Sequence, residues 1–449
     1  MISPARWAAF EALRLADQTK GSGKDLASAL AGTRKMVSDP RDRALATELA
    51  LGVERWRATL DAIISTSSGR RIGTIDFPAL LSLRLAVFQM KFLTRTPAHA
   101  VVDDAVEITR QAGASRAAGF VNGVLRGLQR HGFDAGLPSR PQGADASAWT
   151  HYIATSLSHP AWLAARMIAR HGADAAEAWA TFNNTPAPLT LRVNTRRLTV
   201  DEAQARLEAD GVTTAPAPHA PHALIVTDGN PIGSPLHEDG SIALMDETSQ
   251  LVGTLAAGAL EGRVLDACAA PGGKTLVLSD DLPRGSRLVA ADRRPRRVTL
   301  LRRALERYGL ADVPVVQHDL SQGVPFLGLD GIFVDAPCSG LGTIRRDPDI
   351  RWRRAETDLA TLAAAQTAML HHAALAIRPG GRIVYSTCSS EPEENEDVVE
   401  SFLASHAGFQ RAAIEGARFA PFIDARGDFR TLPQRDGLES FFAAVLQRS

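Results

Sequence analysis

After about residue 250 the chain alternates short apolar runs with longer helical stretches, and this alternation constrains the fold more than any other feature. The runs are RVLDAC, RLVAAD, VPVVQHD, GIFVDAP and GRIVYSTC, and helices are expected over 295–308 and 355–378 between them. Strands buried on both faces read as continuous apolar runs, and crossover helices cover both faces of a parallel sheet. The sequence therefore predicts a doubly wound, mostly parallel α/β sheet, to which FFAAVLQ adds an antiparallel edge strand.

The first 132 residues or so predict a separate all-helical bundle. In segments such as ARWAAFEALRLADQ and DRALATELALGVERWRATLDAIIS, apolar residues recur every three or four positions, and Gly- or Pro-containing turns separate the segments. A polar, Pro- and Gly-containing stretch over 132–147 then breaks the pattern.

A small mixed segment connects the bundle to the sheet. It predicts helices around 159–182 and 200–210 and strands at 188–194 and 222–228. We therefore expect three parts: a helical domain over 1–135, an α+β connecting segment over 150–240, and a catalytic domain over 241–449.

Composition narrows the class of protein. With 449 residues, 45% hydrophobic and 22% charged, the chain suits a globular protein of two or three domains, and no apolar run approaches the twenty residues that cross a bilayer. Charged residues interrupt any signal-like N-terminus, so we expect a cytoplasmic protein. The three cysteines are far apart and lack C-x-x-C spacing, which argues against a disulfide framework and against a metal site.

The turn after the strand RVLDAC is the strongest candidate for a cofactor site. In such sheets ligands bind beyond the carboxyl ends of the strands, and two adjacent glycines at a helix N-terminus let the backbone approach a ligand closely. A phosphate-binding P-loop would need glycine five positions before Gly273, where Cys268 stands, so we reject it. The expected cofactor-binding turn consists of Cys268, Ala269, Ala270, Pro271, Gly272, Gly273 and Lys274.

Acidic residues close the following strands. Asp292 lies at the position from which an acid binds the ribose hydroxyls in these folds. Asp319 could accept a hydrogen bond from an adenine amino group, and Asp335 follows the fourth strand. An aspartate at a loop or helix cap is commonplace, but acids after successive strands favour a ligand with a ribose, an adenine and a charged end. We therefore expect S-adenosylmethionine as the cofactor.

Two thiols and one lysine lie at the same predicted rim. Cys338 follows the fourth strand and Cys388 the fifth, while Lys274 is the only lysine after Lys91 in a chain that otherwise uses arginine. The C5 carbon of a pyrimidine is too weak a nucleophile to take a methyl group unaided. A thiolate added at C6, with an acid engaging N3, makes C5 nucleophilic, so this set of residues suits pyrimidine C5 methylation.

Three segments carry a resemblance to a known family. LDACAAPGGKT, VDAPCSGLGTIRRDPDIRWR and YSTCSSEPEENEDVV closely resemble those of the RNA 5-methylcytosine methyltransferases, the NOL1/NOP2/Sun family. FLTRTPAHAVVDDAVEI and GFVNGVLRGL look like the NusB-type RNA-binding domain of the bacterial branch, which methylates a cytosine of small-subunit ribosomal RNA, and PLTLRVNT and MDETSQL also look like family elements. The resemblance implies a Rossmann-like methyltransferase domain with a mostly parallel seven-stranded sheet, preceded by a NusB-like bundle and a small α+β segment.

The resemblance also implies roles for the site residues. Cys388 would attack C6, Cys338 would help to release the product, and Asp335 would contact the cytosine ring and line the cofactor pocket; we count Lys274 with this catalytic group. DNA cytosine methyltransferases instead place the nucleophile in a Pro-Cys motif, here Cys338, and chemistry alone does not choose between the two thiols. Ser390 and Glu393 have capping-box spacing, which predicts that Cys388 lies just before a helix N-terminus that favours a thiolate, although nearby glutamates oppose that effect.

The leading hypothesis is a cytoplasmic, monomeric enzyme that methylates C5 of a specific cytosine in 16S rRNA before the ribosome is fully assembled, through a covalent cysteine–C6 intermediate. The alternatives are the same chemistry on tRNA, and a non-catalytic RNA-binding factor of the antitermination type. No membrane or metal partner is expected. The residues expected to contact RNA are Arg345, Arg346, Arg351 and Trp352, although a packed tryptophan is more common than a stacking one.

Overall fold

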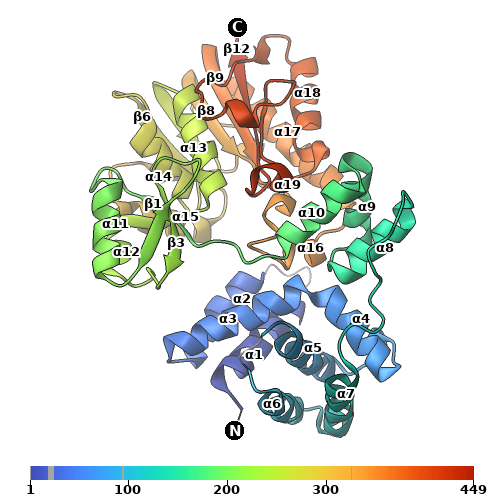
Figure 1. The fold of residues 1–449 in the computed structure, drawn as a ribbon. Coiled ribbons are helices and arrows are strands. Elements are labelled where there is room, and N and C mark those ends of the chain that lie inside the picture. The colour runs from blue at the N-terminus through green and yellow to red at the C-terminus, as the bar shows by residue number, and fades with distance from the viewer. Residues whose placement is uncertain (1, 19–24, 94–95, 325) are drawn as a thin grey trace. The chain divides into compact units, whose positions relative to one another are not determined.

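The computed structural model describes all residues except 1, 19–24, 94–95 and 325, and it divides into two compact units, drawn in Figure 1. The first unit combines Met1–Pro186 with Ile344–Glu356. The second combines Ala187–Thr343 with Thr357–Ser449. A short segment of the C-terminal half therefore belongs to the N-terminal unit.

The first unit is helical, as its apolar periodicity predicts. Helix α5 forms its centre, because every residue from Ala79 to Gln89 is buried, and a helix that is buried all round belongs to the middle of a bundle. The α-helices before the inserted segment are α1 (Pro4–Gln18), α2 (Leu26–Thr33), α3 (Pro40–Arg55), α4 (Arg57–Ser68), α5 (Phe77–Phe92), α6 (Ala98–Gln111), α7 (Ala118–His131), α8 (Ala146–Ser156), α9 (Ala161–His171) and α10 (Ala173–Asn183).

One helix expected from the sequence is divided in two. The periodic segment 42–65 is split at Trp56, whose backbone has φ −107° and ψ 15° and leaves the helical region. The Trp56 ring stacks on Phe92 at the end of α5, with the ring centroids 4.6 Å apart. Packing against the central helix therefore accompanies a bend that periodicity alone does not reveal.

The inserted segment 344–356 is held in the first unit by Arg351 on α16 (Ile350–Arg353). This guanidinium is completely buried and donates to the carbonyl of Ser158 at 2.7 Å, to the side-chain oxygen of Asn184 at 3.0 Å and to the carbonyl of Asn183 at 3.3 Å. Burial lowers the pKa of Arg351 to about 9. The expectation that Arg351 contacts RNA is wrong, because its guanidinium is buried and donates its hydrogen bonds to acceptors inside the protein.

The neighbours of Arg351 are also engaged within this unit. The indole nitrogen of Trp352 donates to the carbonyl of Glu54 at 2.7 Å. The Arg345 guanidinium lies over the Phe182 ring, 4.4 Å from its centroid. Three of the four residues expected to contact RNA thus help to attach the segment to the helical unit.

The second unit begins with a four-stranded antiparallel sheet in the order β2-β3-β1-β4. Its elements are β1 (Thr190–Val193), α11 (Val200–Ala209), β2 (Thr213–Pro216), β3 (Ala223–Asp228), α12 (Pro235–Glu238) and β4 (Ile242–Leu244). The strands β1 and β3 and the helix α11 confirm the strands expected at 188–194 and 222–228 and the helix expected at 200–210.

The larger sheet follows in the order β10-β12-β9-β8-β5-β6-β7, with β11 paired to β12. All pairings from β9 to β7 are parallel, whereas β12 is antiparallel to β9, β10 and β11. The strands are β5 (Arg263–Asp266), β6 (Arg287–Asp292), β7 (Val315–Gln317), β8 (Leu329–Asp335), β9 (Ile377–Thr387), β10 (Phe409–Arg411), β11 (Phe429–Arg430) and β12 (Phe442–Arg448). FFAAVLQ is thus an antiparallel strand as expected, but it is not the edge, because β10 and β11 pair beyond it.

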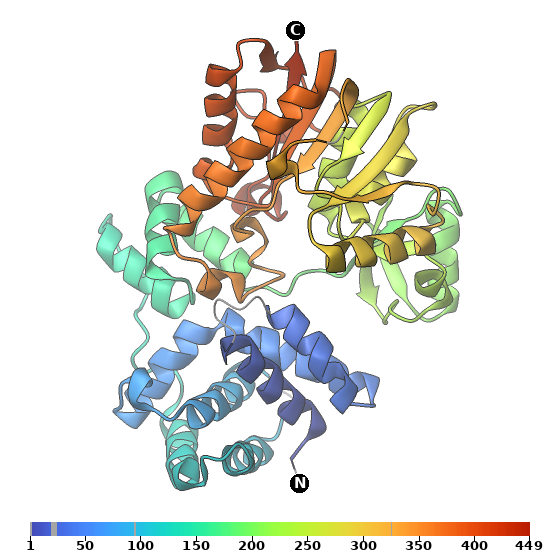
Figure 2. The ribbon, with the colours of Figure 1, turned by 180° about the vertical axis from the view of Figure 1, so that it is seen from behind.

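Helices cover both faces of this sheet, as Figures 1 and 2 show. Successive strand residues point to opposite faces: in β8, Phe333 joins the core that contains α13, whereas Ile332 and Val334 join the core that contains α17 and α18. The helices are α13 (Glu247–Ala259), α14 (Gly273–Asp281), α15 (Pro295–Tyr308), α17 (Asp358–Ala376), α18 (Glu396–Ser405) and the short α19 (Pro433–Asp436). The predicted doubly wound arrangement is confirmed.

Across the ranges described, no helix combines the length and the apolar character needed to cross a bilayer.

We predict that Arg351→Ala lowers the free energy of unfolding of the helical unit by about 3 kcal/mol, because it leaves buried carbonyls without a donor and opens a cavity. Arg353→Ala, which removes a partly buried i,i+4 contact to Asp349 at the start of the same short helix, should cost less, about 0.5 kcal/mol. Urea unfolding followed by circular dichroism measures both. Equal effects of the two substitutions would contradict the anchoring role of Arg351.

Candidate active site

The expected site residues gather where the parallel strands of the larger sheet end. Asp292 and Asp335 are the last residues of β6 and β8, and Cys388 directly follows β9. Asp319 lies two residues after β7 and caps a 3₁₀ turn, Leu320–Gln322. Carboxyl ends of neighbouring parallel strands lie at one edge of a sheet, which is where such folds bind ligands.

The turn 268–274 has the close-approach geometry expected of a cofactor loop. Gly272 has φ +112°, a backbone conformation that favours glycine, and Gly273 begins α14. A Cβ atom on Gly273 would lie 3.3 Å from the sulfur of Met245, so little space remains for a side chain there.

Asp292 organises this turn from the neighbouring strand. Its Oδ2 accepts a hydrogen bond from the backbone N–H of Ala270 at 3.3 Å, and its Oδ1 accepts from the N–H of Arg294 at 3.1 Å. Arg297 of α15 lies 3.4 Å from the same carboxylate and also donates to the carbonyl of Ala270. The two expected parts of the cofactor site are therefore physically connected.

Asp319 is held by its own loop. Its Oδ1 accepts from the N–H of Ser321 at 3.0 Å and from the Ser321 hydroxyl at 2.7 Å, and Arg293 lies 3.6 Å from Oδ2. Burial acts to raise the pKa of Asp319, but these hydrogen bonds and the arginine outweigh it and lower the pKa. The group is an anionic acceptor at neutral pH.

Lys274 forms an ion pair with Asp335. The ammonium Nζ lies 2.7 Å from Oδ2 of Asp335, whose Oδ1 accepts from the hydroxyl of Ser386 at 2.9 Å. Burial acts to lower the pKa of Lys274, but the Asp335 carboxylate and, more weakly, Cys388 outweigh it and raise the pKa. The ammonium also lies over the ring of Phe441, 5.4 Å from its centroid. Lys274, at the end of the cofactor turn, is therefore a charged ammonium at neutral pH that lies beside Asp335 and influences Cys388.

The two thiols expected at one rim are in contact. The sulfur atoms of Cys338 and Cys388 are 3.3 Å apart, and both residues are partly exposed. The hydrogen bond with Cys388, together with burial, raises the pKa of Cys338. Cys338 is therefore a protonated thiol at neutral pH and can donate to its neighbour.

Gly342 joins the loops that carry the two thiols. Its N–H donates to the carbonyl of Cys388 at 2.9 Å, and its carbonyl accepts from the N–H of Ser440 at 3.0 Å. A Cβ atom at Gly342 would lie 1.9 Å from the Ser440 carbonyl oxygen, so the contact requires glycine.

Cys268 has a different character from the other two cysteines. Burial is the main cause that raises the pKa of its thiol, and the carboxylates of Asp335, Asp266 and Asp292 add to the effect. A thiol in that environment stays neutral. Its role in the expected cofactor turn stays a prediction.

The predicted capping box after Cys388 is wrong. The Ser390 hydroxyl donates to Glu391, and α18, the helix that a capping box would begin, starts only at Glu396. Residues Pro392–Glu394 form a 3₁₀ turn that separates the thiol from that helix. The proposed helix-terminus contribution to a Cys388 thiolate therefore has no basis in the structure.

Several residues of the site escaped the sequence reading. Asp266 at the end of β5 is fully buried, and the acidic run after Cys388 contains Glu394, which accepts hydrogen bonds from the loops of both thiols. Asp266 could have been found as one more acid at a strand end. The contacts that Glu394 makes outside its own loop could not, because those partners, Gln366 and Ser339, lie 28 and 55 residues away.

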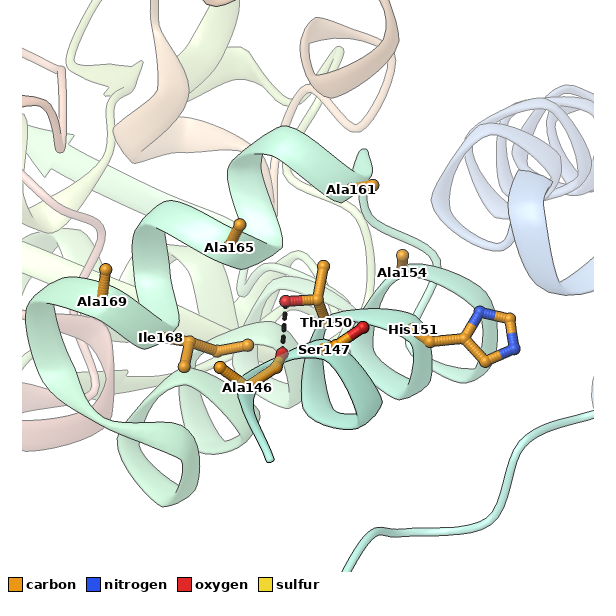
Figure 3. Close-up of a pocket in the computed structure, with 9 residues that line it drawn as sticks. All are labelled: Ala146, Ser147, Thr150, His151, Ala154, Ala161, Ala165, Ile168 and Ala169. Carbon is orange, nitrogen blue, oxygen red and sulfur yellow. Dashed lines mark hydrogen bonds between the residues drawn. The ribbon is translucent and has the colours of Figure 1, made fainter. Parts of the chain in front are cut away.

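A hollow lies on the helical unit, between α8 and α9 (Figure 3). It has a volume of about 470 Å³ and is lined mainly by small side chains such as Ala154, Ala161 and Ala165. His151 is the one titratable side chain in its lining, so the hollow offers little chemistry.

Family profiles match three successive parts of the chain. The 16S rRNA methyltransferase RsmB/F family matches residues 254–447, the NusB family matches 3–130, and the RsmF/B-like ferredoxin-like domain matches 159–233. The order of these matches agrees with the expected order of a NusB-like bundle, a small α+β segment and a methyltransferase domain.

Relatives match over nearly the whole chain. A probable ribosomal RNA small subunit methyltransferase B of Bacillus subtilis is 32% identical over 415 residues, covering 91% of each chain. The ribosomal RNA small subunit methyltransferase B of Xanthomonas campestris is 34% identical over 443 residues, covering 96% of this chain and 94% of the relative.

Solved structures share the fold. A protein named PH0851 superposes with a TM-score of 0.82 at 24% identity, covering all of this chain and 99% of that one. A methyltransferase homolog protein from Pyrococcus horikoshii superposes with a TM-score of 0.56 at 26% identity, covering 66% of this chain and 97% of its own.

The buried acid Asp266 makes stability depend on pH. Burial raises its pKa to about 7, although Thr275 donates to Oδ2 at 2.7 Å and opposes the shift. Between about pH 4 and pH 7 the folded protein holds a proton that the unfolded chain releases, so the free energy of unfolding falls as the pH rises through this window, by about 4 kcal/mol for a shift of this size.

We predict that Asp266→Asn, which cannot ionise, removes this part of the decline. Urea unfolding of both proteins at about pH 5 and about pH 8 measures the difference. An unchanged dependence on pH in the variant would show that Asp266 does not carry the buried proton.

Proposed function

The chain belongs to the 16S rRNA methyltransferase RsmB/F family, and we propose that it methylates C5 of one cytosine in 16S rRNA through a covalent cysteine adduct. It is an S-adenosylmethionine-dependent rRNA methyltransferase, as the sequence predicted. The observation that carries the proposal is the contact between the Cys338 and Cys388 sulfurs beside the Lys274–Asp335 pair. Two thiols, a carboxylate and a cation at one sheet edge suit C5 methylation of a pyrimidine, which needs a thiolate nucleophile.

In the proposed mechanism the Cys388 thiolate adds to C6 of the cytosine. The pair of electrons of the C5–C6 double bond then makes C5 a nucleophile, which takes the methyl group. After transfer, a water molecule takes the C5 proton, the C5–C6 double bond re-forms and the Cys388–C6 bond breaks, which returns the thiolate. Nucleophilic catalysis of this kind divides one difficult step into easier ones.

Asp335 and Lys274 assist the addition. N3 of the ring takes a proton from solvent as C6 is attacked, and the Asp335 carboxylate accepts a hydrogen bond from the resulting N3–H. Lys274 keeps Asp335 oriented through its 2.7 Å contact and places a positive charge beside it. A preorganised charge of this kind costs no reorganisation during the reaction.

We assign Cys338 to product release. Its raised pKa keeps it protonated, so it suits proton exchange with the neighbouring thiolate better than the attack on C6. The alternative, in which Cys338 attacks as in DNA cytosine methyltransferases, exchanges the roles of the two thiols.

The residues at the ends of β5, β6 and β7 fit S-adenosylmethionine. The glycines at 272 and 273 leave room for close approach, Asp292 suits the ribose hydroxyls, and Asp319 suits an adenine amino group. When bound there, the cofactor supplies an electrophilic methyl group. The remaining residues of the turn, from Cys268 to Lys274, line the same site in this proposal.

We propose that residues 1–135 and 150–240 bind RNA and that 241–449 catalyse, in a cytoplasmic monomer that acts before the ribosome is fully assembled. The matches to NusB and to rRNA methyltransferases support an RNA substrate. Methylation of a tRNA cytosine remains the competing enzymatic function. A test is to incubate the protein with labelled S-adenosylmethionine and RNA from cells that lack the enzyme, and then to map the modified cytosines; a mark in tRNA alone would overturn the proposal.

We predict that Cys388→Ala abolishes methyl transfer, whereas Cys338→Ala still transfers but accumulates a covalent RNA–protein adduct. The reason is that only the first substitution removes the proposed nucleophile. Denaturing gel electrophoresis of single-turnover reactions with labelled RNA separates the two outcomes. The reverse pattern would exchange the roles of the thiols.

We also predict that Asp292→Ala weakens S-adenosylmethionine binding by about tenfold or more, because it removes both the proposed ribose contact and the hydrogen bond that holds Ala270. Asp312→Ala, an exposed acid before β7, serves as the matched control. Isothermal titration calorimetry measures both dissociation constants. Equal affinities would remove Asp292 from the cofactor site.

A further inference from the structure

Each active-site thiol is followed directly by a serine, and both serines bind the same carboxylate. Ser339 follows Cys338 at the end of β8, and Ser389 follows Cys388 at the end of β9. The Ser389 hydroxyl donates to Oε2 of Glu394 at 2.5 Å, and the Ser339 hydroxyl donates to the same oxygen. The two hydroxyl oxygens are themselves 3.1 Å apart.

The other oxygen of Glu394 holds the Cys338 loop from both sides. Its Oε1 accepts from the backbone N–H of Ser339 at 2.7 Å and from the side-chain amide of Gln366 at 3.0 Å. The same Gln366 amide donates to the carbonyl of Pro337 at 3.0 Å. Ser339, which follows Cys338, therefore binds the carboxylate directly, and Pro337, which precedes Cys338, is linked to it through Gln366.

Glu394 is itself firmly placed. It is completely buried, and its carbonyl accepts from the hydroxyl of Tyr385 at 2.5 Å. The neighbouring Asn395 donates to the carbonyl of Ser389 at 3.0 Å. A buried carboxylate needs several donors to offset its lost hydration, and the four donors found here come from uncharged groups of the two cysteine loops and α17.

Neither strand pairing nor the glycine contact alone fixes the two sulfurs. Strand pairing of β8 with β9 ends at Asp335 and Ser386, before either cysteine. Beyond that point, the loops are joined by contacts that include the Gly342 N–H to the Cys388 carbonyl, the Glu394 network and the contact between the two serine hydroxyls. The network reaches the residue next to each sulfur.

We propose that Glu394 is a positioning residue that sets the separation of the Cys338 and Cys388 thiols by binding Ser339 and Ser389 at once. This inference rests on the proposed function for the roles of the thiols. Glu394 touches neither reacting atom, and it acts through the serines. With the carboxylate removed, the two loops lose their shared acceptor and the thiols separate.

The first test measures thiol proximity without RNA. Diamide removes one hydrogen from each of two adjacent thiols, so the rate of Cys338–Cys388 disulfide formation, followed by peptide mass mapping, reports how often the sulfurs meet. We expect Glu394→Ala to slow this reaction by at least tenfold. Glu394→Gln, which keeps an acceptor oxygen and an amide that the rotating hydroxyls can accept from, should restore most of the rate.

A matched pair of serines controls for general effects on the loop. Ser389→Ala removes a donor to Glu394 and should slow disulfide formation, whereas Ser390→Ala removes an equally buried hydroxyl that donates to Glu391 and should leave the rate unchanged. Should Glu394→Ala fail to fold, Ser389→Ala and Glu394→Gln still decide the question. Equal rates for the Ser389→Ala and Ser390→Ala proteins would overturn the proposal.

The second test measures methyl transfer. Because misplacement of a catalytic group by about 1 Å can cost about a hundredfold in rate, we expect Glu394→Ala to lower kcat by about a hundredfold while KM for RNA and affinity for S-adenosylmethionine stay within about twofold. Partial rescue by Glu394→Gln is expected here as well. A loss in KM alone would contradict a positioning role.

The outcomes also separate this proposal from the proposed function. If the Cys338→Ala protein accumulates no covalent RNA adduct, the proposed chemistry fails, yet the disulfide rates still report on Glu394. If methyl transfer by Glu394→Ala is as fast as in the wild type and its disulfide rate is also unchanged, the positioning role fails while the chemistry stands.

Discussion

Parallel pairing of β8 with β9 is the constraint on which the site depends. Asp335 lies opposite Ser386 in this pairing, so the loops that leave the two strands start side by side although 50 residues separate the two cysteines. The helix α17 makes the crossover between these strands and supplies Gln366 to the same network. Backbone hydrogen bonds thus bring together the two loops on which the proposed thiol chemistry depends.

Three buried or half-buried carboxylates at this rim behave differently because their surroundings differ. Asp266 has one hydroxyl donor and little else, so burial raises its pKa to about 7. Asp335 is paired with the Lys274 ammonium and receives the Ser386 hydroxyl. Glu394 has four uncharged donors. Asp266 therefore holds a proton, Asp335 forms an ion pair with Lys274, and Glu394 joins two loops.

The predictions from sequence succeeded where one local pattern decided the outcome. Helix α15 occupies 295–308 as expected, and the glycine turn begins a helix as expected, because periodicity and turn chemistry are properties of neighbouring residues. They failed where a distant partner decided. Trp56 divides a periodic helix beside Phe92, FFAAVLQ is covered by β10 and β11, and the serine and glutamate after Cys388 do not form a capping box.

The sequence by itself determined the kind of sheet, the glycine turn at the start of a helix, and the acids and thiols at the strand ends, because each of these depends on short contiguous patterns. Only the tertiary structure decided that Arg351 is an internal anchor rather than a contact for RNA, and that Glu394 binds the loops of both thiols. Burial and hydrogen-bond pairing arise from groups that are distant along the chain, so no local pattern reports them.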